Sequence, residues 1–90
     1  MIMVEIWFHN DSYRKTPPFG KGYRPHFVIK GTEEYIGVQF VEIENAPFGE
    51  HLLCEVEFLF YGLVDYSKLV PDAKFEIREG RNIVGEGIVL

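Results

Sequence analysis

The sequence predicts an all-β domain, a small six-stranded antiparallel β-barrel or sandwich. Two observations support this prediction. Glycine and proline recur at short intervals along the chain, and β-branched and aromatic residues fill the segments between them. In these segments apolar and polar residues alternate, which gives each strand one apolar face. A six-stranded sheet with one apolar face must close or fold over to bury that face.

The elements follow from the same patterns in chain order. Residues 2–9 and 51–61 alternate most clearly and form the first strand and the longest strand. A long connection is expected at 10–22, because proline lacks the N–H that a sheet needs and glycine admits positive φ. Other breaks are expected at 45–49, at 62–72 and at Gly80-Arg81, which predicts a tight turn. The remaining strands are expected at 25–30, 35–42, 73–79 and 82–90.

The size and composition fit one domain over residues 1–90, because the chain has 90 residues, 47% of them hydrophobic. A single cysteine leaves no intramolecular disulfide framework and no cysteine-based zinc site. No apolar run approaches the roughly 20 residues that span a bilayer, so no membrane association is expected. The N-terminus has no basic region and no small-residue cleavage site, which indicates a cytoplasmic protein.

Charge is distributed unevenly along a chain whose net charge is −5. The segment 12–32 holds five bases and no acid, whereas the rest of the chain holds four bases and all fourteen acids. A basic segment of this kind can attract an anion to one face, or it can simply balance an acidic barrel. The sequence leaves both interpretations open.

No catalytic or metal-binding motif is present, so we expect a non-enzymatic protein without cofactor or metal. Cys54 lies on the apolar face of its strand, which predicts a core position rather than a nucleophile. The three histidines, which Asp11 or Glu50 could assist as metal ligands, lack metal-ligand spacing. Glu55 and Glu57 fit a solvated outer face better than an acid–base pair. Gly85-Glu86-Gly87 predicts close backbone approach within the last strand.

One segment, residues 21–27, combines chemistry that suits a nucleic acid. It packs two cations, a histidine and two aromatic residues around one glycine and one proline. Glycine lets backbone approach a ligand, arginine can fork onto a phosphate, and tyrosine can stack or hydrogen-bond. The same residues also suit a barrel corner at which Tyr23 and Phe27 are core.

This segment also resembles a known family. Gly22-Tyr23-Arg24-Pro25-His26-Phe27 is similar to the Gly-Tyr-Arg-Pro-Gln-Phe segment of the C-terminal barrel, domain 3, of translation elongation factor Tu. Arg14-Lys15-Thr16-Pro17-Pro18-Phe19 resembles the Arg-His-Thr-Pro-Phe-Phe of that domain. The closing stretch 75–89 resembles its Phe-Ala-Ile-Arg-Glu-Gly-Gly-Arg-Thr-Val-Gly-Ala-Gly-Val-Val. These blocks occur in the family's order over nearly the whole chain.

The resemblance implies a six-stranded antiparallel barrel that binds structured RNA such as tRNA. In the family this domain contacts the T stem of aminoacyl-tRNA, and carry-over onto the matching positions gives Arg14, Lys15, Arg24 and His26. The chain contains no GTPase domain, so no nucleotide binding is expected. Together with the rest of the basic segment, the candidate RNA-binding residues are Arg14, Lys15, Lys21, Tyr23, Arg24, His26 and Lys30.

The alternative is a protein-interaction module without RNA contact. In the family the same domain also packs against the GTPase domain and contacts the exchange factor. A protein partner from the translation machinery, or a second copy of this chain, is therefore the alternative ligand. Trp7 lies on the non-core face of the first strand, and Trp7 and Tyr61 are the candidate anchors for such a contact. Exposed edges of the first and last strands would assist it.

Overall fold

Six β-strands form in the segments where alternating residues predict them. The computed structural model describes residues 1–10 and 13–90. In this part of the chain, no helix has the length and apolar character needed to cross a membrane. The strands are β1 (Ile2–Phe8), β2 (His26–Ile29), β3 (Ile36–Phe40), β4 (Leu52–Phe58), β5 (Lys74–Glu79) and β6 (Asn82–Val89).

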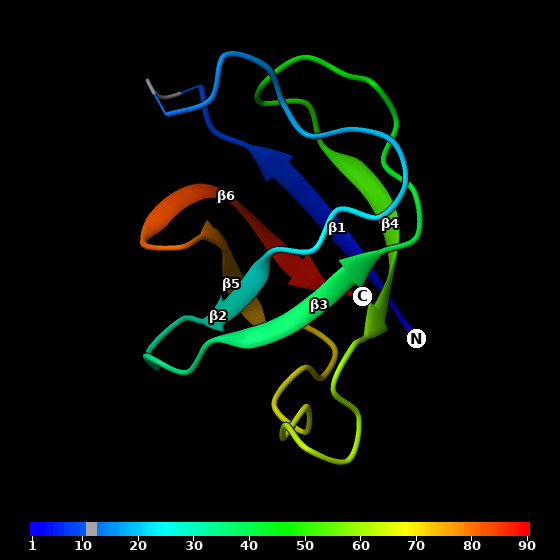
Figure 1. Cartoon of the computed structure of the whole chain (residues 1–90), viewed down its shortest axis with the longest axis vertical. Coiled ribbons are helices and arrows are strands. Elements are labelled where there is room, and N and C mark those ends of the chain that lie inside the picture. Colours follow the sequence, from blue (N-terminus) through cyan, green and yellow to red (C-terminus); the bar gives the residue numbers. More distant parts are fainter. Residues whose placement is uncertain (11–12) are drawn as a thin grey trace.

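The strands close into an antiparallel barrel with the neighbour order β1-β4-β3-β2-β5-β6 (Figure 1). β1 closes the ring, because it pairs with β4 on one side and with β6 on the other. The all-β prediction is confirmed, and of its two forms the barrel is the one that occurs. The expectation of exposed edges on the first and last strands is wrong, because each supplies the other's missing neighbour.

The core lies inside this ring and is built from the inward side chains of all six strands. Phe27 from β2 and Phe75 from β5 stack with ring centroids 3.9 Å apart, and Phe40 from β3 meets Phe27 edge-on at 5.7 Å. Val4 and Ile6 of β1 are fully buried, which confirms the apolar face predicted for the first strand. Cys54 is buried beside them as predicted.

The two glycines of β6 face this core where there is no room for a side chain. A Cβ atom on Gly87 would lie 2.5 Å from Phe75 Cζ and 2.8 Å from the backbone oxygen of Glu5. A Cβ atom on Gly85 would lie 2.6 Å from the backbone oxygen of Trp7. The predicted close backbone approach in the last strand is confirmed, and it lets β1 and β6 pair tightly around the large rings.

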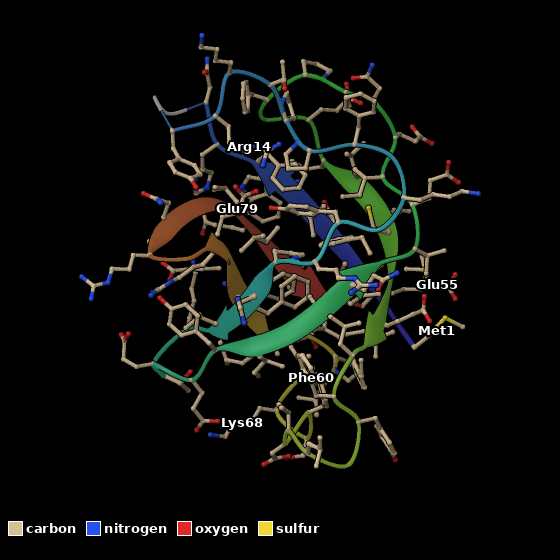
Figure 2. All side chains as sticks on the ribbon, viewed as in Figure 1. Met1, Arg14, Glu55, Phe60, Lys68 and Glu79 are labelled. Carbon is tan, nitrogen blue, oxygen red and sulfur yellow. The ribbon has the colours of Figure 1, made fainter. Side chains whose placement is uncertain are left out.

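β4 is shorter than predicted. It ends at Phe58 rather than near residue 61, and the side chain of Phe60, which alternation puts on the same face as Cys54, is 47% exposed. The Phe60 N–H donates to the hydroxyl of Tyr66, at 3.0 Å, instead of to a neighbouring strand. The Tyr66 hydroxyl in turn donates to the Gly37 carbonyl, at 2.6 Å, so the segment after β4 folds back under the barrel (Figure 2).

Candidate nucleic-acid interface

The predicted RNA-binding residues centre on residues 13–24, which we call the basic loop. It crosses one end of the barrel between β1 and β2 (Figure 1). Gly20 exchanges two backbone hydrogen bonds with Ile43, at 2.8 and 2.9 Å, and Phe40 donates its N–H to the Tyr23 carbonyl, at 2.9 Å. These bonds hold the loop against the connection that follows β3.

Two of the predicted residues fasten the loop to β5. The Arg14 guanidinium and the Tyr23 hydroxyl both donate to Glu79 Oε2, each at 2.5 Å (Figure 2). The Tyr23 ring packs against the rings of Phe40 and Phe8. Burial, and then the hydrogen bond to Glu79, raise the pKa of Tyr23, so its hydroxyl stays protonated at neutral pH. Arg14 and Tyr23 therefore serve the fold, and both are already partnered.

Lys30 and His26 lie outside the basic loop, in or directly after β2. Lys30 follows the far end of β2, and its ammonium pairs with Glu86 of β6 at 2.5 Å. Glu86 also accepts from His9 at 2.9 Å, and its pKa is lowered chiefly by the hydrogen bond from Lys30. His26 lies on β2, where its ring meets that of Tyr35 edge-on at 5.5 Å. The electrostatic contribution of Lys30 to an anion site is thus largely compensated by Glu86.

Three cations of the basic loop remain directed at solvent. Lys15, Lys21 and Arg24 are exposed, and none of them forms an ion pair with a residue in the described part of the chain. Lys21 borders an open hollow of about 230 Å³, at which the side chain of Phe19 is 59% exposed. The hollow is lined by Arg14, Thr16, Pro17, Pro18, Phe19, Lys21, Gly22 and Tyr23.

Phe19 was not predicted as a site residue. An aromatic side chain that follows two prolines is equally typical of a core position, and only the folded loop shows that this ring faces water. An exposed ring between cations can stack on a base or lie along a sugar. It therefore adds a non-electrostatic contact to the three free charges.

Acidic residues limit the size of this basic surface. Residues 31–67 contain eight acids and no lysine or arginine. The Gly20–Ile43 pairing places part of that segment, with Glu42 and Glu44, directly beside the basic loop. An anion approaching the loop meets three exposed cations with acidic residues close by rather than a wholly basic face, so salt should weaken its binding readily.

The two candidate anchors for a protein partner lie apart from each other. Trp7 is half-buried on the outer face of β1 and stacks on His51, with 4.2 Å between ring centroids and 6° between ring planes. Tyr61 is 82% exposed on the segment that follows β4, beyond the opposite end of the β1–β4 pair. Tyr61 borders a largely apolar hollow of about 480 Å³, lined also by Phe58, Gly62, Val64, Asp65, Tyr66 and Ser67.

The groups considered for catalysis or metal binding have other roles. Among residues 1–10 and 13–90, no three His, Cys, Asp or Glu side chains lie close enough to hold a metal ion together. His9 pairs with Glu86 and His51 with Glu5, whereas Asp11 lies outside the described residues. Burial raises the pKa of the Cys54 thiol to about 11, so little thiolate forms at neutral pH.

No protein-family model matches the sequence, and no solved structure matches the fold. The barrel is therefore established by its own strand pairing, whereas the resemblance to domain 3 of elongation factor Tu stays a prediction from the sequence.

Proposed function

We propose that this chain is a non-enzymatic binding module that binds structured RNA of the tRNA type through the basic loop. The observation that supports this best is the group formed by Lys15, Lys21 and Arg24, three solvent-facing cations without an ion partner among the described residues. Phe19 and the adjacent hollow offer a surface for a sugar or a base. Arg14 and Tyr23 act indirectly, because they fasten the loop to Glu79.

The number of exposed cations sets the salt dependence that this proposal predicts. Each phosphate that a lysine or arginine neutralises releases condensed counterions, so affinity falls as salt rises. Three phosphate contacts predict a slope of about −2 to −3 in a plot of log K against log salt. The net charge of −5 works against any polyanion, so binding should be measurable mainly at low salt.

The test is fluorescence anisotropy with a labelled tRNA transcript over a series of salt concentrations. Lys15→Gln, Lys21→Gln and Arg24→Gln should each weaken binding and each lower the slope by roughly 0.7–0.9. Lys68→Gln is the matched control, because it also removes one exposed positive charge but lies on the far segment that follows β4. Its effect should be small.

Two results would contradict this proposal. One is a salt slope near zero, which would mean that phosphates are not the contact. The other is an equal loss of affinity in Lys68→Gln and Arg24→Gln, which would mean that only net charge matters. Circular dichroism melts of all four variants exclude unfolding as the cause.

A second candidate function is a protein-interaction module, which the exposed segment after β4 favours. Tyr61 and Leu63 are 82% and 88% exposed, Phe60 beside them in the chain is 47% exposed, and Tyr61 borders the apolar hollow of about 480 Å³. Large exposed apolar side chains grouped in this way are typical of contact surfaces. Affinity capture with and without ribonuclease separates the two functions. A protein that stays bound after ribonuclease treatment, and is lost in Tyr61→Ser/Leu63→Ser, supports this second candidate.

A further inference from the structure

A smaller hollow lies on the outer face of β1, β6 and β5, away from the basic loop. Its volume is about 190 Å³, and it is lined by Trp7, Lys30, Lys74, Glu86, Gly87 and Ile88. The strand register brings these residues together, because Trp7 pairs with Glu86 and Lys74 pairs with Ile88 across β6. The indole and Ile88 are half-buried, so the hollow has apolar walls with charged groups at its border.

The ion pairs around this hollow leave one charge unmatched. Glu79 at the end of β5 bonds to Arg14, and each of the other three carboxylates on these strands also bonds to a basic side chain. Glu5 bonds to His51, Glu86 pairs with Lys30 and accepts from His9, and Glu76 pairs with Arg78. Lys74 is exposed and forms no ion pair with any residue that the structure describes.

An unmatched ammonium beside an apolar wall defines the kind of ligand that fits. A carboxylate can pair with this lysine without displacing a bond already made, since Glu5, Glu76 and Glu86 keep their own partners. An indole face and an isoleucine side chain offer contact to an aromatic or aliphatic body. The volume limits that body to about the size of one ring with a short chain.

We propose that this hollow binds an apolar carboxylic acid, with its carboxylate on Lys74 Nζ and its apolar body against Trp7 and Ile88. The site shares no exposed cation with the proposed RNA surface, because Lys15, Lys21 and Arg24 lie on the basic loop. Loss of RNA binding would therefore leave this inference intact, and the reverse also holds.

The chain offers a direct probe, because Trp7 is its only tryptophan and lines the hollow. We would titrate the protein with 3-phenylpropionate and follow indole emission. A saturable change with a dissociation constant on the order of 1 mM is expected for one ion pair and one buried ring. 3-Phenylpropylamine, which carries the opposite charge on the same body, and acetate, which lacks the body, should give no saturable change.

Matched variants locate the contact. Lys74→Gln should raise the dissociation constant about fivefold, the upper range for an exposed ion pair, whereas Lys74→Arg should keep it within about twofold. Lys15→Gln removes the same charge from the basic loop and should have little effect. In amide ¹H–¹⁵N spectra, the largest ligand-induced shifts should fall on Gly87 and Ile88.

The ligand can be a free small acid or the C-terminal end of a polypeptide, since both present a carboxylate beside an apolar group. N-acetylglycylphenylalanine serves as the peptide arm, and its C-terminal amide as the control. Saturable binding of 3-phenylpropionate or of N-acetylglycylphenylalanine supports the site. The acid that binds more tightly shows whether the ligand is a free small acid or the C-terminal end of a polypeptide. The inference is overturned if neither acid saturates, if the amide binds as well as the acid, or if Lys15→Gln and Lys74→Gln weaken binding equally.

Discussion

Gly87 shows at the residue scale how a barrel of this size encloses large rings. With no side chain at this position, Phe75 can fill the space against β6 while β1 pairs closely alongside. Two of the three nearest atoms to a new Cβ belong to the Phe75 ring, and the third is a backbone oxygen. Neither group can move without disturbing the core or the β1–β6 ladder.

We therefore expect Gly87→Ala to destabilise the protein by about 2 kcal/mol, the usual cost of overpacking a tight core. Gly37→Ala is the matched control. Its Cβ would also clash, at 2.6 Å, but with the ring of Phe60, which is half-exposed and can swing outward. Urea unfolding measures both variants. An equal loss in the two would show that rigidity around Gly87 is not the cause.

The buried thiol of Cys54 should make the free energy of unfolding fall at alkaline pH. Burial raises the pKa of this thiol from 9.0 to about 11, so the folded state holds its proton at a pH where the unfolded chain has lost it. The unfolded state then binds fewer protons, and the free energy of unfolding must fall as the pH rises from 9.0 to about 11.

Urea midpoints measured across this range test the expectation. The wild-type midpoint should decline with pH, and Cys54→Ala should decline less, whatever its own starting stability. Part of the decline should remain in the variant, because the pKa of Tyr23 is raised as well. Identical slopes for both proteins would mean that Cys54 does not titrate differently on unfolding.

The sequence predicted which way most side chains point but not which charges meet. The alternation of residues in β1 is enough to place Val4 and Ile6 inside and Glu5 and Trp7 outside. Arg14 and Glu79, by contrast, are 65 positions apart and become partners only through the register of the closed ring. For this reason only three of the five cations in the basic segment, Lys15, Lys21 and Arg24, have no ion partner among residues 1–10 and 13–90.

At the element scale, the hydroxyl and ring of Tyr66 attach the segment from 59 to 72 to the barrel. The buried Tyr66 hydroxyl accepts from Phe60 N and donates to the Gly37 carbonyl, and its ring stacks on Phe58 at 4.1 Å. These contacts tie the end of β4 and the middle of β3 to a segment that has no strand of its own. We expect this segment to loosen before any strand once the hydroxyl is removed.

Tyr66→Phe should cost about 1–3 kcal/mol, because it leaves a part-buried amide and a buried carbonyl without that partner. Tyr61→Phe, which removes a hydroxyl from an 82% exposed ring, should change stability little. Urea unfolding gives the energies, and hydrogen exchange at the Phe60 amide gives the location. Slow exchange at Phe60 in the Tyr66→Phe variant would show that another group holds this turn.

This element also explains why the predicted end of β4 was wrong. Alternating apolar residues continue from Leu52 to Phe60, so the sequence pattern alone extends the strand. The strand ends earlier because its pairing with β3 stops at Val38, which faces Phe58, and the Phe60 N–H bonds to the Tyr66 hydroxyl instead. Strand length thus depends on a neighbour that a local pattern does not contain.

For the whole molecule, neighbouring strands of the barrel differ in how many residue pairs join them. Only two residue pairs join β2 to β3, whereas five join β1 to β4 and five join β1 to β6. Beyond those two pairs the contact continues through irregular bonds, including a long one of 3.3 Å from the Val38 N–H to the Pro25 carbonyl. The seam between β2 and β3 is therefore the weakest junction of the barrel.

Native-state hydrogen exchange should show that the seam between β2 and β3 opens more readily than the pairs that β1 forms with β4 and β6. We expect the Val38 amide to exchange through a local opening of lower free energy than the amides of Val4 and Ile6, which should open only with global unfolding. The free energies are read from the dependence of exchange on low concentrations of urea. A common value for all three amides would mean that the barrel opens as a single unit.

Because β1 pairs with two strands, it is the strand that two copies of this protein can exchange. β1 is the first strand, and the long segment 9–25 joins it to the rest of the barrel. If β1 leaves the ring, β4 and β6 both lose a neighbour, and the gap accepts any chain with the same register. The best replacement is β1 of another molecule, so refolding at high concentration should yield strand-exchanged dimers that separate only by unfolding again.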